Sequence, residues 1–266
     1  MTPLSLVASE NISPMLSDPL FLSIAIFCVL LVGISKAGFG GAMGSLAVPL
    51  LSLMIATPQA AAIMLPILLV MDAAGLVIFR GKGDSTNLRI MIPGALVGVL
   101  LGALFFHWVD IRWIKGMIGL EAFLFGLDRL RQVKAITRPR PPEFARGLFW
   151  SSISGFASFI SHAGGPPVLQ YLLPQGMDRE RLVGTTVIFF SFVNFTKVIP
   201  YGFLGLLDLS NLTTSALLLP AIPVGYWIGL KLLKGLPQRP FNLAIAFAML
   251  VTGLKLLGDA LLSGIF

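Results

Sequence analysis

The chain has 266 residues, of which 56% are hydrophobic and only 12% are charged. Soluble domains typically carry about 25% charged residues. The composition therefore excludes a soluble globular protein and indicates an integral membrane protein. The net charge of +7 comes from basic residues beside hydrophobic segments, which favours orientation in a bilayer over nucleic-acid binding. The one cysteine, Cys28, lies in an apolar run, so a disulfide framework or a cysteine metal site is excluded.

The first 18 residues form a short polar segment before the first hydrophobic stretch. They contain Glu10 and Asp18 and no positively charged leader, so we expect no cleaved signal peptide. We interpret residues 1–18 as a lead-in to the membrane-embedded part of the chain.

Eight hydrophobic segments follow in chain order. They lie at about 19–55, 59–79, 90–109, 111–128, 144–173, 182–204, 209–233 and 241–265. The first and the fifth are interrupted by residues 35–41 and 161–167, which combine glycine and proline, the strongest helix breakers. Each interrupted segment is either a full crossing with an irregular end or a re-entrant hairpin.

The positive-inside rule separates these two interpretations. If all eight segments cross the membrane, sixteen loop-associated basic residues divide nine to seven between the two sides. If the two interrupted segments are hairpins, the division becomes fourteen to two, with only Arg112 and Lys115 on the minority side. We therefore favour the hairpins, which leaves six full crossings and places both termini, including residues 1–18, outside the cytoplasm.

A basic, proline-rich stretch at residues 129–143 then becomes a cytoplasmic linker between two halves, residues 19–128 and 144–266. Its prolines are Pro139, Pro141 and Pro142. We interpret its basic residues as orientation signals that contact lipid headgroups.

The two halves share a repeated pattern. Ile34-Ser35-Lys36-Ala37-Gly38 recurs 126 residues later as Ile160-Ser161-His162-Ala163-Gly164, and Pro93, Gly98, Gly102 and Gly126 recur at an offset of 127. Three crossings per half is an odd number, so the second copy is inserted upside down. The sequence thus predicts an all-α polytopic membrane protein with two inverted repeats, each a broken, re-entrant hairpin plus three transmembrane helices.

Two rows of small residues have a packing interpretation. Gly94, Gly98 and Gly102, and Ala221, Gly225 and Gly229, are spaced four apart, so each row lines one face of a helix. Such a face allows a second helix to approach closely. The rows predict tight contacts within the chain or in a homodimer, and they allow a homodimer without requiring one.

A few polar residues lie deep in the hydrophobic segments. They are Lys36, Asp72, Glu121, His162, Asn194, Lys197 and Lys255. A charge at the bilayer centre costs roughly 2.5–3.5 kcal/mol on the gentlest scale, so each position needs an explanation. Lys36 and His162 occupy equivalent positions in the two halves and are expected to face each other.

The chemistry of these positions suits a small anion. Glycine-rich tips expose backbone N–H groups, inward helix N-termini add partial positive charge, and Lys36 adds a full charge. His162 binds an anion when protonated or relays a proton. The expected substrate-binding residues are Ser35, Lys36, Gly38, Gly40, Gly41, Ser161, His162, Gly164, Gly165, Asn194 and Lys197. The alternative is that Lys36 pairs with a buried carboxylate and His162 only hydrogen-bonds a carbonyl.

The remaining polar residues have two interpretations each. Asp72 and Glu121 either couple transport to protons, together with His162, or neutralise a lysine. Asn194 and Lys197 lie about one turn apart on a common helix face and either line the site or join helices. Lys255 is expected to reach a membrane interface.

The paired motifs, Gly33 to Ala42 and Gly155 to Pro167, resemble the sulfite exporter TauE/SafE family of bacterial membrane proteins. The resemblance covers residues 20–260. It implies a permease in the bacterial inner membrane that exports sulfite or a small organosulfonate by alternating access, with a small anion and the bilayer as its partners.

Other classes of function were weighed against this one. An enzyme would need a nucleophile with a base or a metal cluster, but the chain has no His-Glu-x-x-His or Gly-x-Ser-x-Gly motif and only two histidines, His107 and His162. We therefore expect no enzymatic activity, metal or cofactor. A passive anion channel, an uptake permease for another small carboxylate or sulfur compound, and a membrane assembly partner remain as alternatives.

Overall fold

A computed structural model describes residues 18–106, 108, 110–131 and 139–262. The expected lead-in, apart from Asp18, and the centre of the expected linker, residues 132–138, lie outside this part of the chain.

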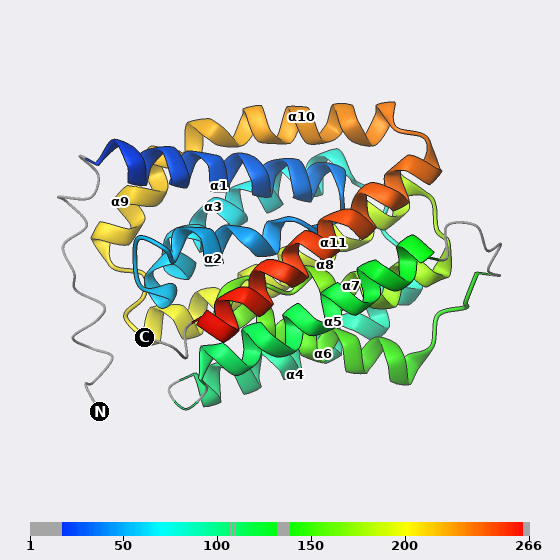
Figure 1. Ribbon diagram of the computed structural model, residues 1–266, viewed down its shortest axis with the longest axis horizontal. Helices are drawn as coiled ribbons and strands as arrows, with labels where there is room; N and C mark the ends of the chain where they lie inside the picture. The colour runs from blue at the N-terminus through cyan, green and yellow to red at the C-terminus, as the bar shows by residue number, and fades with distance from the viewer. Residues whose placement is uncertain (1–17, 107, 109, 132–138, 263–266) are drawn as a thin grey trace.

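The described residues form a bundle of helices (Figure 1). In chain order these are α1 (Pro19–Gly38), η3 (Gly44–Leu46), α2 (Ala47–Leu51), α3 (Thr57–Ile78), α4 (Ser85–Phe105), α5 (Ile111–Arg131), α6 (Phe144–Ser161), α7 (Gly165–Leu172), η5 (Leu173–Gln175), α8 (Arg179–Phe203), α9 (Leu209–Leu218), η6 (Leu219–Ala221), α10 (Ile222–Gly235) and α11 (Gln238–Leu262).

Four helices begin at an aspartate whose carboxylate accepts a hydrogen bond from a backbone N–H of the first turn. These residues are Asp18 before α1, Asp84 before α4, Asp178 before α8 and Asp208 before α9. A side-chain acceptor at this position satisfies an N–H group that has no partner within the helix. The aspartates therefore set where these helices start.

Six stretches of the described chain are long and apolar enough to cross a membrane. They are α1, α3, α4, α8, residues Leu209–Gly235 (α9 through α10) and Leu243–Leu261 within α11. The protein is thus an all-α polytopic membrane protein with about six candidate transmembrane helices. The set differs from the expected six crossings in containing α1 and omitting α5, which carries several charged residues.

Both interrupted segments break where the glycines predict. The chain leaves α1 at Gly38 through residues 39–43, the first tip, in which Gly40 and Gly41 adopt φ values of 60° and 89° that favour glycine. Figure 1 shows the chain from η3 through α2 running back toward the end of the bundle where α1 begins. The two arms around the first tip are therefore unequal, because α1 alone is about 30 Å long and α2 spans only five residues. The re-entrant hairpin itself stays a prediction.

The second break follows α6. His162 ends that helix in the left-handed conformation, with φ 53°, and residues 162–164, the second tip, lead into α7. α6 and α7 pack on each other, as α1 and α2 do.

The helix contacts between the two halves are related: replacing each helix by the helix at the equivalent position in the other half turns one contact into another. α1 packs on α10 while α6 packs on α4, and α5 and α3 pack on their counterparts α11 and α8. Each of these four contacts thus has an equivalent, or is its own equivalent, when the two halves swap places. The inverted repeat itself stays a prediction.

The two rows of small residues lie at two of these contacts, α4 against α6 and α10 against α1. A Cβ placed on Gly98 of α4 would lie 2.0 Å from the carbonyl oxygen of Ser152 in α6. A Cβ on Gly229 of α10 would lie 2.7 Å from the carbonyl oxygen of Ile34 in α1. The predicted packing role is confirmed within the chain, and these contacts need no second copy of the protein.

We predict that Gly98→Ala destabilises the protein, because the added methyl group meets backbone that cannot move alone; overpacking of this kind costs about 1–3 kcal/mol. Thermal unfolding in detergent measures the effect. Gly202→Ala in α8 is the matched control, since a Cβ there has nothing within 4 Å. Equal melting temperatures for the two variants would contradict the packing role of Gly98.

Candidate functional site

The two tips meet inside the bundle. A Cβ placed on Gly165, directly after the second tip, would lie 2.4 Å from the carbonyl oxygen of Gly41 in the first tip. Both glycines line a cavity of about 50 Å³. A single water molecule needs roughly 10–15 Å³, so the cavity has room for a few waters or a small anion.

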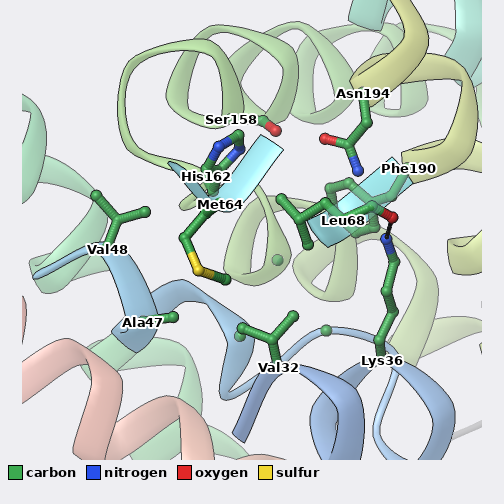
Figure 2. Close-up of a pocket in the computed structure, with 13 residues that line it drawn as sticks. Val32, Lys36, Ala47, Val48, Met64, Leu68, Ser158, His162, Phe190 and Asn194 are labelled. Carbon is green, nitrogen blue, oxygen red and sulfur yellow. Dashed lines mark hydrogen bonds between the residues drawn. The ribbon is translucent and has the colours of Figure 1, made fainter. Parts of the chain in front are cut away.

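Polar side chains enter this cavity from three long helices (Figure 2). Lys36 comes from the end of α1, Ser158 and His162 from the end of α6, and Asn194 from the middle of α8. The remaining wall is mainly apolar and includes Val32, Met64, Leu68 and Phe190. Lys36 and His162, which are expected to face each other, both line this cavity.

Lys36 is held by an acidic partner. Its Nζ lies 2.5 Å from Oδ1 of Asp72 in α3, and both side chains are less than a tenth exposed. The side-chain amide of Asn194 donates to the other carboxylate oxygen of Asp72, at 2.7 Å. This hydrogen bond joins α8 to the ion pair.

His162 is held by a basic partner. Nζ of Lys197 lies 2.7 Å from Nδ1 of His162, and Nε2 of His162 lies 2.9 Å from the carbonyl oxygen of Ala61. A carbonyl oxygen only accepts, so Nε2 carries the hydrogen and Nδ1 accepts from Lys197. The ring is therefore the neutral Nε2–H tautomer in this arrangement.

These contacts match the alternative that the sequence left open. Lys36 pairs with a buried carboxylate, and His162 hydrogen-bonds a carbonyl. Asp72, considered only for coupling or neutralisation, is the direct partner of Lys36. The role of Lys36 and His162 in binding an anion stays a prediction.

In the first tip, backbone N–H groups that were expected to be free are bonded to Ser35 instead. The N–H groups of Met43 and Gly44 donate to Oγ of Ser35 at 2.9 Å, and those of Phe39 and Gly41 donate to the carbonyl oxygen of Ser35. Buried N–H groups need acceptors, and Ser35 supplies two. Ser35 therefore organises the tip.

The second tip differs from the first in its glycines. The N–H groups of His162 and Ala163 donate to carbonyl oxygens of α6, and Pro166 and Pro167 have no N–H group. Ser161 is buried at the end of α6. The N–H groups of Gly164 and Gly165, at the start of α7, have no hydrogen-bond acceptor among the described residues, so the expected backbone donors remain here.

The other expected glycines have packing positions. A Cβ added to Gly38 would contact Gly229 of α10. A Cβ on Gly40 would contact Leu169 of α7 and Thr186 of α8, and one on Gly164 would contact Ser154. Of the five glycines expected to bind substrate, Gly41 and Gly165 line the cavity.

Glu121 and Lys255 are the remaining deep polar residues. The side chain of Glu121, in α5, is outside the part of the chain that the structure describes. Lys255 pairs with Asp259, one turn further along α11. The expected position of its side chain at a membrane interface stays a prediction.

Two serines were missed by the sequence analysis. Ser158 lies four residues before His162, so helical periodicity already places both on one face of α6. Ser45, in η3, is 1% exposed, and its Oγ has no hydrogen-bond partner among the described residues. That oxygen would lie 3.1 Å from a Cβ on Gly165, so it is next to the tip contact. No sequence signal marked Ser45.

We predict that Lys36→Met costs about 3–5 kcal/mol of stability, because it leaves the Asp72 carboxylate buried without its cation. The double variant Lys36→Met/Asp72→Asn should recover most of that loss, since neither charge remains. Chemical or thermal unfolding in detergent checks both. A double variant as unstable as the single one would show that the ion pair is not the cause.

The chain was also compared with known proteins. Residues 25–256 match the family model described as sulfite exporter TauE/SafE. No curated protein and no solved structure matches the chain. Since the match covers most of its length, the chain belongs to the sulfite exporter TauE/SafE family and is a multi-pass membrane transporter, not an enzyme.

Proposed function

We propose that the protein is a permease that exports a small anion, sulfite or an organosulfonate, by alternating access. The observation that carries the proposal is the cavity between the two tips, which Lys36 and His162 line and behind which Lys197 lies.

The composition of the cavity suits an oxyanion. Hydrogen-bond donors are available from Lys36, Ser158 and Asn194, and Ser45 has an unused hydroxyl beside Gly165. The apolar part of the wall excludes bulk water, which strengthens the attraction between a lysine and an anion. A small space with a few convergent polar groups is the usual form of a ligand site.

The placement of the cavity supports alternating access over a passive channel. Tips from both halves meet at the site. The contact of α1 with α10 corresponds to that of α6 with α4 when the two halves are swapped. In inverted-repeat transporters the substrate lies where the broken helices meet, and one half moves against the other. Motion of one half would open the tip contact toward one side at a time.

The orientation follows from the basic residues. Figure 1 shows α1 beginning and α11 ending on one side of the bundle, while α5 and α10 end, and α6 and α11 begin, on the other. That second side carries Arg146, Lys234 and Arg239, so we assign it to the cytoplasm. Both termini then lie outside the cytoplasm. Export as the direction rests on the family alone.

Proton coupling is part of the proposal. A proton on Asp72 would remove the charge that holds Lys36 and would leave the ammonium group available to an anion. Glu121 and His162 are the other candidates for coupling.

We predict that sulfite or a small organosulfonate raises the melting temperature of the purified protein, and that Lys36→Met/Asp72→Asn removes this response while the protein stays folded. Lys255→Met is the matched control, because it removes a lysine that lies outside the cavity. Stabilisation of the double variant equal to that of the parent would show that Lys36 does not contribute to anion binding.

Flux into everted membrane vesicles separates the classes of transporter. A permease coupled to protons should move the anion only while a proton gradient is present, whereas a channel should continue after the gradient collapses. Loss of flux in Lys36→Met/Asp72→Asn and retention in Lys255→Met would support the assigned site. Unchanged flux in the double variant would exclude it.

A further inference from the structure

The charges around the cavity do not cancel. Among the described residues, the ionisable groups that face it or back its wall are Lys36 from α1, Asp72 from α3, His162 from α6 and Lys197 from α8. Two tyrosines lie nearby: Tyr201 of α8 donates its hydroxyl hydrogen to the carbonyl oxygen of Phe159, and Tyr226 of α10 lies beside Gly75 of α3. Both are neutral near physiological pH.

Lys197 has the hydrogen-bond environment of an ammonium group. Its Nζ is surrounded by three acceptors: the carbonyl oxygen of Ser158 at 3.0 Å, the hydroxyl oxygen of Ser158 at 3.0 Å, and Nδ1 of His162 at 2.7 Å. An ammonium group has three donors and no acceptor, so the three contacts satisfy it. A neutral amine fits the same three atoms only when the Ser158 hydroxyl turns to donate its hydrogen to the lone pair of the amine.

His162 cannot carry a second positive charge in this arrangement. Both ring nitrogens of an imidazolium are donors. Its Nδ1–H would then point at the ammonium group of Lys197, 2.7 Å away. His162 therefore stays neutral while Lys197 is protonated.

The charges of Lys36 and Asp72 cancel, whereas the charge of Lys197 beside His162 is not cancelled. Lys36 and Asp72 carry opposite charges in contact, and among the described residues Lys197, which is 0% exposed, has no carboxylate in contact. The described site thus has one positive charge in excess. An uncompensated charge inside the membrane is costly, so the site is completed by one negative charge.

We propose that this cavity accepts one net negative charge: a monoanion binds alone, and a dianion binds only together with one proton. This inference rests on the proposed function and narrows it to singly charged sulfonates or hydrogen sulfite, or to a doubly charged anion carried with a proton.

The structure also indicates where the proton goes. Nδ1 of His162 already accepts from Lys197, so the carboxylate of Asp72 is the described acceptor that remains. A hydronium ion or a protonated buffer molecule gives up the proton: its bond to that proton breaks, an O–H bond forms on Asp72, and water or the deprotonated buffer is left. The ammonium group of Lys36 then turns to the second negative charge of the anion. No other bond forms or breaks.

The test uses two small anions whose charges do not change near neutral pH, methanesulfonate with one negative charge and sulfate with two. Isothermal titration calorimetry of the purified protein in buffers of different ionisation enthalpy counts the protons taken up on binding. We expect no proton with methanesulfonate and one with sulfate. The affinity for sulfate should then fall about tenfold per unit rise in pH, while that for methanesulfonate stays constant.

The outcomes are distinct. Sulfate binding without a proton, or methanesulfonate binding with one, would overturn the charge balance and leave the anion site in place. If neither anion binds and sulfite or organosulfonates bind no better, the proposed function fails, and this inference fails with it.

Two variants test the roles of Asp72 as the proton acceptor and of Lys197 as the source of the excess charge. Asp72→Asn should bind sulfate with no proton uptake and with an affinity independent of pH, because the proton acceptor is gone. Lys197→Met should weaken methanesulfonate binding at least about tenfold, because the excess charge is gone. Lys255→Met should leave the proton counts and affinities of the parent. A Lys197→Met protein that binds methanesulfonate like the parent would refute the role of Lys197 even if Asp72→Asn fails to fold.

Discussion

The buried ion pair between Lys36 and Asp72 is the interaction on which the rest of the site depends. It joins the end of α1 to α3, and Asn194 adds α8 through the second carboxylate oxygen. A charge at this depth is tolerated only when its partner is close and its remaining hydrogen bonds are satisfied. The pair therefore holds three helices, from both halves of the chain, around one cavity.

Close backbone contact makes this arrangement geometrically feasible. Glycines on α4 and α10 let α6 and α1 approach until main-chain atoms touch, and this brings the ends of α1 and α6 together in the interior. Gly165 then meets the carbonyl oxygen of Gly41. Any larger side chain at these contacts would separate the helices and, with them, Lys36 and His162. The small residues act on the site through packing rather than by contacting a ligand.

The two tips use the same geometry with different chemistry. In each half, the residue at the end of the first helix contacts a residue of the next long helix: Lys36 contacts Asp72, and His162 contacts Lys197. The first contact cancels its charge and the second keeps one. In the charge balance that we propose, this asymmetry gives the cavity an electrostatic preference that a perfectly repeated site would lack, and it links the binding of a dianion to the protonation of Asp72.

The sequence alone determined the class of protein, the positions of the two breaks and the residues at their ends, because hydrophobic length, glycine clusters and deep charges are local features. The spacing of the small residues was enough to predict packing faces. Only the tertiary structure decided that Ser35 uses the backbone donors of the first tip, that Lys197 backs His162 and that Ser158 and Ser45 are next to the cavity. The partners in these contacts come from different helices or from across a turn, and hydrophobic pattern does not encode which side chains meet when helices pack. The unequal arms were also beyond the sequence, because a charge count assigns loops to sides of the membrane but does not measure how far each arm extends.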